Sequence, residues 1–301
     1  MCGFPLIHLD RHLKTLVQHE KRFVAMCEEF PRYTNSGAKE FDRRVSRVIT
    51  PGTLIDESFL NPLENNYLVA ISLSRENDVK NLVGLAWIDV STGEFFSETC
   101  TLESLQDELA RLAPREIVLD SVFKTLKNHP IFTSLSEDSS CLIAYTSSTR
   151  IPNSDEGENA TTAPLSIKSL NEDGPTDLDS NVKQYIANLV NHVDYAESLA
   201  PEETSAINLL TVYLTETMLE HMPLLTSPSR EGVQDRMHID AHTIKGLEIR
   251  ENVYDGGTKG SLLSVLKRTV TNGGTRLLAR WLCKFLSCGN LNDLANALIV
   301  I

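Results

Sequence analysis

The sequence predicts an α/β fold in which a mixed sheet is covered by helices and a helical segment follows. The first observation is a nearly continuous apolar run at residues 82–90 (LVGLAWIDV), typical of a strand buried on both faces. A returning strand is expected at 94–99. The second observation is the helical spacing of leucines in 102–112, directly before another apolar strand at 116–119. A hairpin, a helix and a strand in this order indicate a mixed α/β sheet.

The charge balance is acidic. The chain has 301 residues with a formal net charge of -13. Proteins that bind nucleic acid usually carry the opposite balance, because phosphate contacts supply much of the affinity. Composition alone therefore favours an acidic, non-catalytic scaffold, and any DNA contact must come from a local basic patch. We expect no membrane association, because no apolar run approaches the roughly 20 residues that span a bilayer.

Residues 1–60 predict a first, partial α/β unit. Apolar residues keep helical spacing in 9–17. A short strand is expected at 22–26. Residues 42–50 (DRRVSRVIT) alternate basic and apolar side chains and run into Pro-Gly at 51–52, so they predict a strand that ends in a turn.

Residues 61–222 predict the sheet domain. Its first strand is expected at 67–73. Residues 147–180 are rich in Ser, Thr, Asn, Asp, Glu and Pro, and predict a flexible insertion because they carry too little apolar surface to bury. Helices are expected at 182–190 and 201–222, the second with one apolar stripe.

Residues 223–301 predict the beginning of a helical domain. Alternation at 239–241 indicates a strand, after which Thr243 would cap a helix. Glycine pairs at 256–257 and 273–274 are expected to interrupt the helices around a further helix at 261–267.

Motifs in all three parts resemble the MutS family of DNA mismatch repair proteins, in the family's own order. The first part has MCGFP, VAMCEE and RRVSRVITPGT at residues 1–5, 24–29 and 43–53. The second has NYLVAI and GLAWIDVSTGEF at 66–71 and 84–95. The third has IDA, LE and GSLLSVLKRTVTNGGTRLLARWL at 239–241, 247–248 and 260–282.

The resemblance implies three domains. Residues 1–60 would be the C-terminal half of the mismatch-binding domain. Residues 61–222 would be an RNase H-like connector domain with the insertion 147–180. Residues 223–301 would begin the core, or lever, domain, with an atypical tail at 284–301. The implied function is binding of mismatched double-stranded DNA, with a second MutS-type subunit as dimer partner in the full-length protein. The bacterial-type motifs and the insertion point to the mitochondrial homologue, with a nuclear one as the alternative.

The resemblance also implies what this chain lacks. The family's Phe-x-Glu mismatch wedge would precede residue 1, and the ATPase domain would follow residue 301, so we expect an internal fragment without enzymatic activity. ATP and Mg²⁺ are cofactors of the full-length family, and none is expected here. The GGTKGS loop at 256–261 is not a phosphate-binding loop, because its lysine precedes the last glycine.

The resemblance implies DNA contacts at two places. Arg43 and Arg47 lie on the predicted strand 42–50, where strict alternation would put them on one face with Val45. Arginine forks suit phosphate oxygens, and such contacts position DNA without reading its sequence. Gly3, Phe4 and Pro5 would lie near the minor groove. The alternatives are a solvated basic face and an ordinary turn before a helix.

Asp89 offers a different function. An RNase H-like nuclease holds two metal ions with a carboxylate in a strand and several partners, and here these would be Glu94, Glu108 and Asp120. The alternative is that Asp89 accepts hydrogen bonds from the turn that follows it. We expect the second, and thus no catalytic or metal-binding residue.

Overall fold

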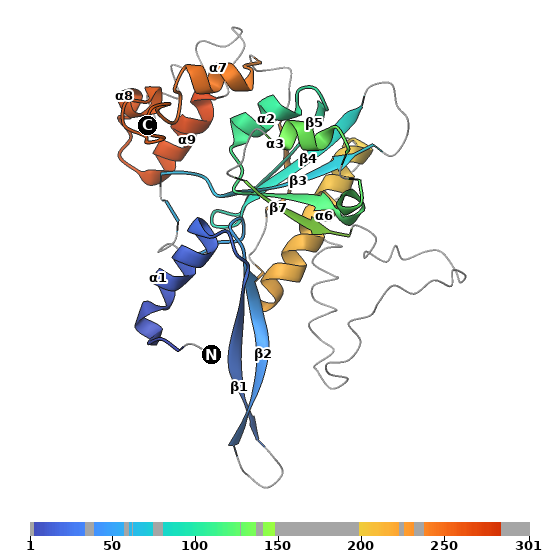
Figure 1. The fold of residues 1–301 in the computed structure, drawn as a ribbon, viewed down its shortest axis with the longest axis vertical. Helices are drawn as coiled ribbons and strands as arrows, with labels where there is room; N and C mark the ends of the chain where they lie inside the picture. Colours follow the sequence, from blue (N-terminus) through green and yellow to red (C-terminus); the bar gives the residue numbers. More distant parts are fainter. Residues whose placement is uncertain are drawn as a thin grey trace, which may run out of the picture.

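A computed structural model describes residues 3–33, 39–56, 60–61, 63–74, 81–126, 128–136, 141–147, 199–222, 226–231 and 238–283. The predicted insertion, apart from Ser147, lies outside these residues, as do the predicted helix at 182–190 and the tail at 284–301. The described part confirms the mixed α/β class (Figure 1). Among its helices, none is both long and apolar enough to cross a membrane.

The first unit is a helical segment beside a long two-stranded ribbon. The helical segment consists of η1 (Leu6–His8), α1 (Leu9–Lys14) and a π-helical turn, η2 (Thr15–His19). The antiparallel strands β1 (Val24–Tyr33) and β2 (Lys39–Ile49) pair from Val24↔Ile49 to Tyr33↔Lys39. The expected strand at 22–26 is thus only the beginning of a longer one. Figure 1 shows the ribbon projecting away from the rest of the molecule. Its base packs on the helical segment through Leu13, Val17, Ile49 and Leu54.

The second unit is a six-stranded mixed sheet in the order β7-β6-β3-β4-β5-β8. β3, β4 and β5 form an antiparallel meander, β6 and β7 run parallel to β3, and β8 runs parallel to β5. The strands are β3 (Tyr67–Leu73), β4 (Leu82–Asp89), β5 (Glu94–Thr101), β6 (Glu116–Asp120), β7 (Leu142–Thr146) and β8 (Ser229–Arg230).

Helices cover both faces of this sheet, which explains the continuous apolar runs of its central strands. α6 (Pro201–Met218) packs on the side chains of Leu68, Ala70, Ala86 and Ile88. The alternate residues, including Val69, Leu85 and Trp87, face α2 (Leu105–Leu112) and α3 (Ile131–Ser136). Two 3₁₀ turns, η3 (Ser121–Lys124) and η5 (Leu219–His221), follow β6 and α6.

α6 approaches the sheet closely at Gly84 in β4. A Cβ atom at this position would lie 2.0 Å from the backbone oxygen of Glu202. The glycine is therefore required by the contact between helix and strand.

The third unit is helical: α7 (Ala241–Gly246), α8 (Leu262–Leu266) and α9 (Asn272–Leu282). The predicted strand at 239–241 is wrong, because Asp240 is the N-cap of α7 and accepts a hydrogen bond from Thr243 N at 3.0 Å. Thr243 is thus not the cap but lies in the first turn. The predicted interruption at 273–274 is also wrong, since both glycines lie in the first turn of α9, where Gly274 N donates to Thr271 Oγ1.

Candidate nucleic-acid interface

Arg43 lies on the exposed ribbon and is paired across the two strands. Its Nη2 lies 2.6 Å from Glu29 Oε1, and its side chain is 73% exposed. The hydrogen bond and the charge of Glu29 raise the pKa of Arg43. Nearby, the guanidinium of Arg44 stacks 3.9 Å from the ring centre of Phe30. An exposed ion pair of this kind contributes little to folding, and a phosphate at Arg43 would compete with Glu29 for its Nε and Nη2 atoms.

Arg47 has a different environment from Arg43. Its Nη2 lies 2.8 Å from Asp56 Oδ2, and its side chain is only 16% exposed. The register shifts from Met26↔Arg47 to Cys27↔Val45, so Ser46 is an extra residue in β2. This bulge interrupts the strict alternation on which the predicted common face of Arg43 and Arg47 rested. Arg47 thus ties the base of the ribbon to the segment after it.

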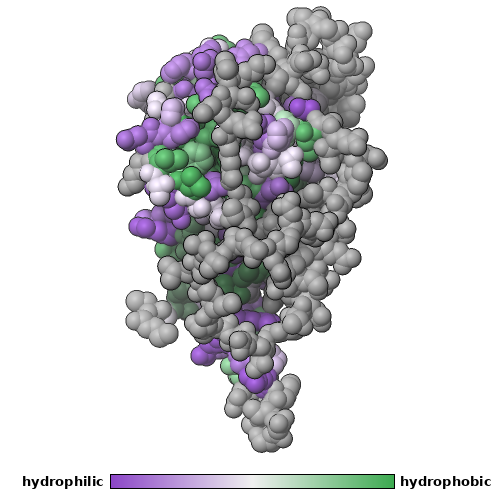
Figure 2. Space-filling view, turned by 90° about the vertical axis from the view of Figure 1, so that its right-hand side faces the viewer, coloured by the Kyte–Doolittle hydropathy of each residue, from purple (hydrophilic) through white to green (hydrophobic). Residues whose placement is uncertain are grey.

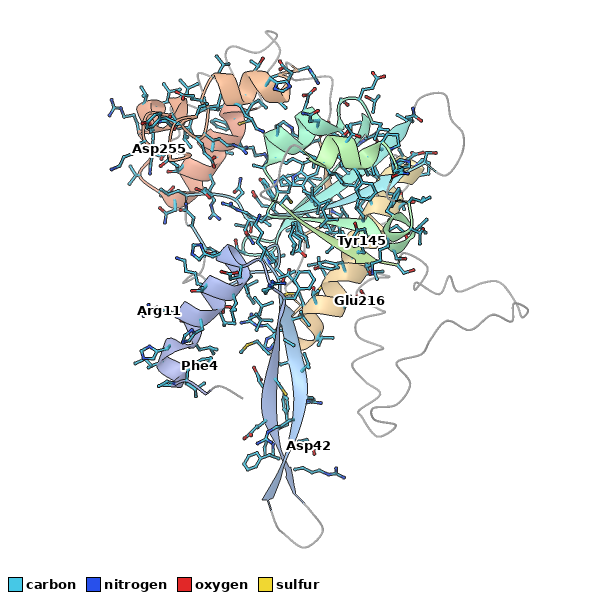
Figure 3. All side chains as sticks on the ribbon, viewed as in Figure 1. Phe4, Arg11, Asp42, Tyr145, Glu216 and Asp255 are labelled. Carbon is cyan, nitrogen blue, oxygen red and sulfur yellow. The ribbon has the colours of Figure 1, made fainter. Side chains whose placement is uncertain are left out.

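Gly3, Phe4 and Pro5 precede η1 on the exposed side of the helical segment. Pro5 is the N-cap of η1, and the ring centres of Phe4 and His12 lie 4.5 Å apart. A Cβ atom on Gly3 would meet nothing within 4 Å. Figure 3 places Phe4 and Arg11 on the side of α1 and Asp42 in the outer half of the ribbon. The predicted DNA-contacting residues therefore lie on two separate elements of one unit.

A buried carboxylate joins this unit to the sheet domain. Glu116, at the start of β6, accepts hydrogen bonds from Thr50 Oγ1 at 2.6 Å and from Gly52 N at 2.8 Å. Its other oxygen accepts a hydrogen bond from the hydroxyl of Tyr213 in α6. Burial raises the pKa of Glu116, although these three donors act to lower it. We call Glu116 with Thr50, Gly52 and Tyr213 the ribbon joint.

A buried ionic cluster joins the sheet domain to the third unit. Arg111 in α2 contacts Glu108 at 2.7 Å, Glu98 at 3.0 Å and Glu231 at 3.2 Å. Arg280 in α9 pairs with the other oxygen of Glu231 and lies over the ring of Phe96. Burial acts to lower the pKa of Arg111, but the surrounding carboxylates outweigh it and the pKa is raised.

We call this ionic cluster the ionic joint, and two further contacts extend it. Arg250 Nη2 donates to the backbone oxygen of Arg111 at 2.5 Å, and Ala241 N donates to Asp107 Oδ1 at 2.7 Å. Sequence reasoning missed both joints. A signal was present at Glu116, which directly precedes the apolar residues 117–119 of β6, but its partners could not be identified.

Asp89 is a structural residue. Its carboxylate is fully buried and accepts hydrogen bonds from Asn66 N at 3.1 Å and from Ser91 N at 3.0 Å. Two of the three expected partners of a nuclease site serve elsewhere, since Glu108 binds Arg111 and Asp120 caps η3. Within the described ranges, no group of three or more His, Cys, Asp or Glu residues could hold a metal ion. The turn interpretation fits this geometry and the nuclease one does not.

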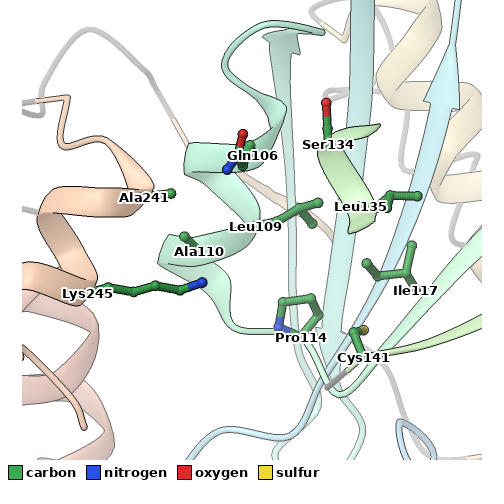
Figure 4. Close-up of a pocket in the computed structure, with 10 residues that line it drawn as sticks. All are labelled: Gln106, Leu109, Ala110, Pro114, Ile117, Ser134, Leu135, Cys141, Ala241 and Lys245. Atoms are coloured by element: carbon green, nitrogen blue, oxygen red, sulfur yellow. The ribbon is translucent and has the colours of Figure 1, made fainter. Parts of the chain in front are cut away.

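The loop at 256–261 does not have the form of a nucleotide site. The hydroxyl of Ser261 caps α8, accepting from Ser264 N at 3.2 Å and donating to Thr258 O at 2.7 Å. The glycines and the lysine of this loop therefore do not form a phosphate-binding loop. A small cavity between α2, α3 and α7, with a volume of about 20 Å³, has room for a water molecule but not for a nucleotide (Figure 4).

Comparisons with known proteins give the same order of domains. Family models of MutS domain I, MutS domain II and MutS domain III match residues 1–58, 66–226 and 242–287. The chain is 35% identical over 283 residues to the DNA mismatch repair protein MutS of Rhodopseudomonas palustris (strain HaA2). It is 33% identical over 285 residues to the protein of the same name from Dinoroseobacter shibae.

Each of these matches covers 93% of this chain and 28% of the relative. The chain therefore spans about 28% of the length of the curated relatives it matches. The resemblance read from the motifs is confirmed at the level of the family, and the relatives are bacterial. Because the domain II model alone matches more than half of the residues, this chain belongs to the MutS family.

Proposed function

We propose that this chain acts in DNA mismatch repair, as a duplex-contacting unit held on a connector. The main support for this proposal is that the chain matches three MutS domains in order and that its relatives are named DNA mismatch repair protein MutS. The geometry adds support, because the candidate contacts are exposed on the projecting unit, while buried joints hold that unit and the helical third unit on the sheet.

In this proposal the two arginines have different roles. Arg43 contacts a phosphate directly, since its side chain is exposed. Arg47 orients the ribbon through Asp56. Gly3, Phe4 and Pro5 meet the duplex from the helical side. The net charge of -13 opposes binding by repulsion. The phosphate contacts themselves weaken as the salt concentration rises, because binding releases counterions from the DNA.

Fluorescence anisotropy with labelled homoduplex and G·T duplex at several salt concentrations tests this proposal. Arg43→Ala should lower affinity by the same factor for both duplexes, because phosphate contacts do not read sequence. It should also reduce the salt slope by about one counterion. Lys124→Ala, which changes an exposed cation on the sheet domain, is the matched control. Absence of duplex binding at low salt would leave the acidic scaffold as the better interpretation.

We further propose that, in a protein of the relatives' length, this connector relays ATP-dependent changes within a dimer of MutS-type subunits. The chain itself should not hydrolyse ATP. Phosphate release from ATP that is abolished by a substitution within residues 1–301 would contradict this.

For the cellular location we propose the mitochondrion, with the nucleus as the alternative. The support is the bacterial form of the TPGT and DVSTGEF motifs at 50–53 and 89–95. Microscopy of the tagged natural protein, with mitochondrial and nuclear markers, distinguishes the two.

A further inference from the structure

One acidic side chain occupies the part of Arg43 that the proposed DNA contact needs. Glu29 in β1 and Arg43 in β2 lie directly opposite each other in the ribbon. Glu29 Oε1 accepts hydrogen bonds from Arg43 Nε at 2.9 Å and from Arg43 Nη2 at 2.6 Å. These two nitrogens form one edge of the guanidinium group, and such an edge can bind two oxygens of a carboxylate or a phosphate. In the absence of DNA, the ribbon therefore already holds an anion where a phosphate would bind.

The pair lies in water, so its anion can be exchanged. The side chains of Arg43 and Glu29 are 73% and 49% exposed. Figure 2 shows hydrophilic side chains at the lower end of the molecule, where the ribbon projects. When a phosphate takes the edge of Arg43, the carboxylate of Glu29 returns to water. It stays on the neighbouring strand, close to the bound phosphate, and the two like charges repel each other.

We propose that Glu29 restrains duplex binding by Arg43, both as a competitor for the guanidinium group and by repulsion of the bound phosphate. This inference rests on the proposed function, in which Arg43 contacts a phosphate. An exposed ion pair is weak, so the restraint lowers the affinity without abolishing it. Because the competition concerns a phosphate and not a base, it lowers the affinity for every duplex by the same factor.

Glu28 is a matched control in the same strand. It lies opposite Arg44, whose guanidinium group stacks 3.9 Å from the ring centre of Phe30. Side chains alternate along a strand, so Glu28 and Glu29 lie on opposite faces of the ribbon. Replacing either by glutamine removes one negative charge from the ribbon, and the change at Glu29 also frees Arg43 from its carboxylate.

Fluorescence anisotropy with the whole chain and a labelled homoduplex at low salt measures the restraint. Glu29→Gln should raise the affinity about two- to fivefold, which corresponds to the strength of an exposed ion pair. Glu28→Gln should raise it less, because this change removes only general repulsion. The midpoint of thermal denaturation should stay unchanged in both variants, since exposed ion pairs contribute little to folding.

A double-mutant cycle tests whether Glu29 acts through Arg43. In an Arg43→Ala background, Glu29→Gln and Glu28→Gln should change the affinity by the same small factor. A labelled G·T duplex should give the same ratios as the homoduplex, because the restraint acts on a phosphate contact.

Three results would contradict the proposal. Equal gains from Glu29→Gln and Glu28→Gln in the presence of Arg43 would mean that only net charge matters. A gain from Glu29→Gln that persists in full in the Arg43→Ala background would mean that Glu29 acts on another contact. Both of these results leave the proposed function intact. Absence of duplex binding in all of these proteins would contradict the restraint and the proposed function together.

Discussion

The Nη1 atom of Arg111 lies 3.2 Å from Glu231 Oε2, although 120 residues separate the two in sequence. Both side chains are buried, and the other carboxylate oxygen of Glu231 pairs with Arg280 in α9. Removing one partner of a buried ion pair leaves uncompensated charge, which typically costs about 3–5 kcal/mol.

Replacing Arg111 should therefore destabilise the chain strongly. Arg111→Leu leaves three buried carboxylates without their shared partner, and we expect a loss of about 3–5 kcal/mol in the free energy of unfolding. Urea denaturation measures it. Arg32→Ala, which removes an exposed pair at 3.9 Å with Asp42, is the control and should change little. A loss below about 1 kcal/mol in Arg111→Leu would mean that the cluster is not a stabilising joint.

Gly84→Ala should loosen α6 from the sheet. The added methyl group would meet the backbone of Glu202, which cannot rotate away as a side chain can. Overpacking typically costs about 1–3 kcal/mol and sometimes more. Thermal denaturation should show a lowered midpoint. At Gly246 in α7 an added methyl group meets nothing within 4 Å, so Gly246→Ala should leave the midpoint unchanged or raise it.

The ribbon joint should make stability depend on pH. Burial raises the pKa of Glu116 above its ordinary value of 4.5. A carboxyl group with a raised folded-state pKa contributes stability below its unfolded pKa, and this contribution is lost as pH rises through the folded pKa. Glu116→Gln keeps the shape and cannot titrate. Above pH 4.5, stability relative to this variant should fall with pH. Parallel curves of the two proteins would contradict the assignment.

Amide exchange should separate the sheet from the ribbon. β4 lies between β3 and β5 and is covered by helices on both faces, so its amides should be among the slowest to exchange. The outer half of the two-stranded ribbon should exchange faster, because an isolated hairpin is only marginally stable. Comparable protection of the two elements, measured by mass spectrometry, would indicate that something else covers the ribbon.

The four central strands of the sheet were predictable because their signals are local, whereas the edge strands β7 and β8 were not predicted. The bounds of β3 agree with the predicted strand at 67–73, and β4 ends one residue before the predicted 82–90. The apolar stripe of α6 is buried at Ile207, Leu210 and Met218, as expected. Long runs with one clear period leave few alternative structures.

The errors arose where short segments allow two structures. Both Asp240 and Thr243 are residues that can cap a helix. In the structure Asp240 accepts a hydrogen bond from Thr243 N, so α7 begins at Ala241 and no strand forms at 239–241. The extra residue Ser46 shifts the register of β2, and alternation cannot predict a bulge. The partners of Glu116 and Arg111 come from distant segments, so only the folded chain brings them together.

The ribbon acts mechanically as a long arm on a short pivot. β1 has 10 residues, which at about 3.3 Å per residue gives an arm of roughly 33 Å. A rotation of about 5° at the base would move the far end by about 3 Å, enough to make or break a phosphate contact. The hydrogen bonds of Thr50 and Gly52 to Glu116, together with the contacts of β2 with α6 and η5, therefore hold the base from which the far end extends. A substitution at Glu116 should therefore change the position of the far end of the ribbon, although it alters no residue on the exposed surface of the ribbon.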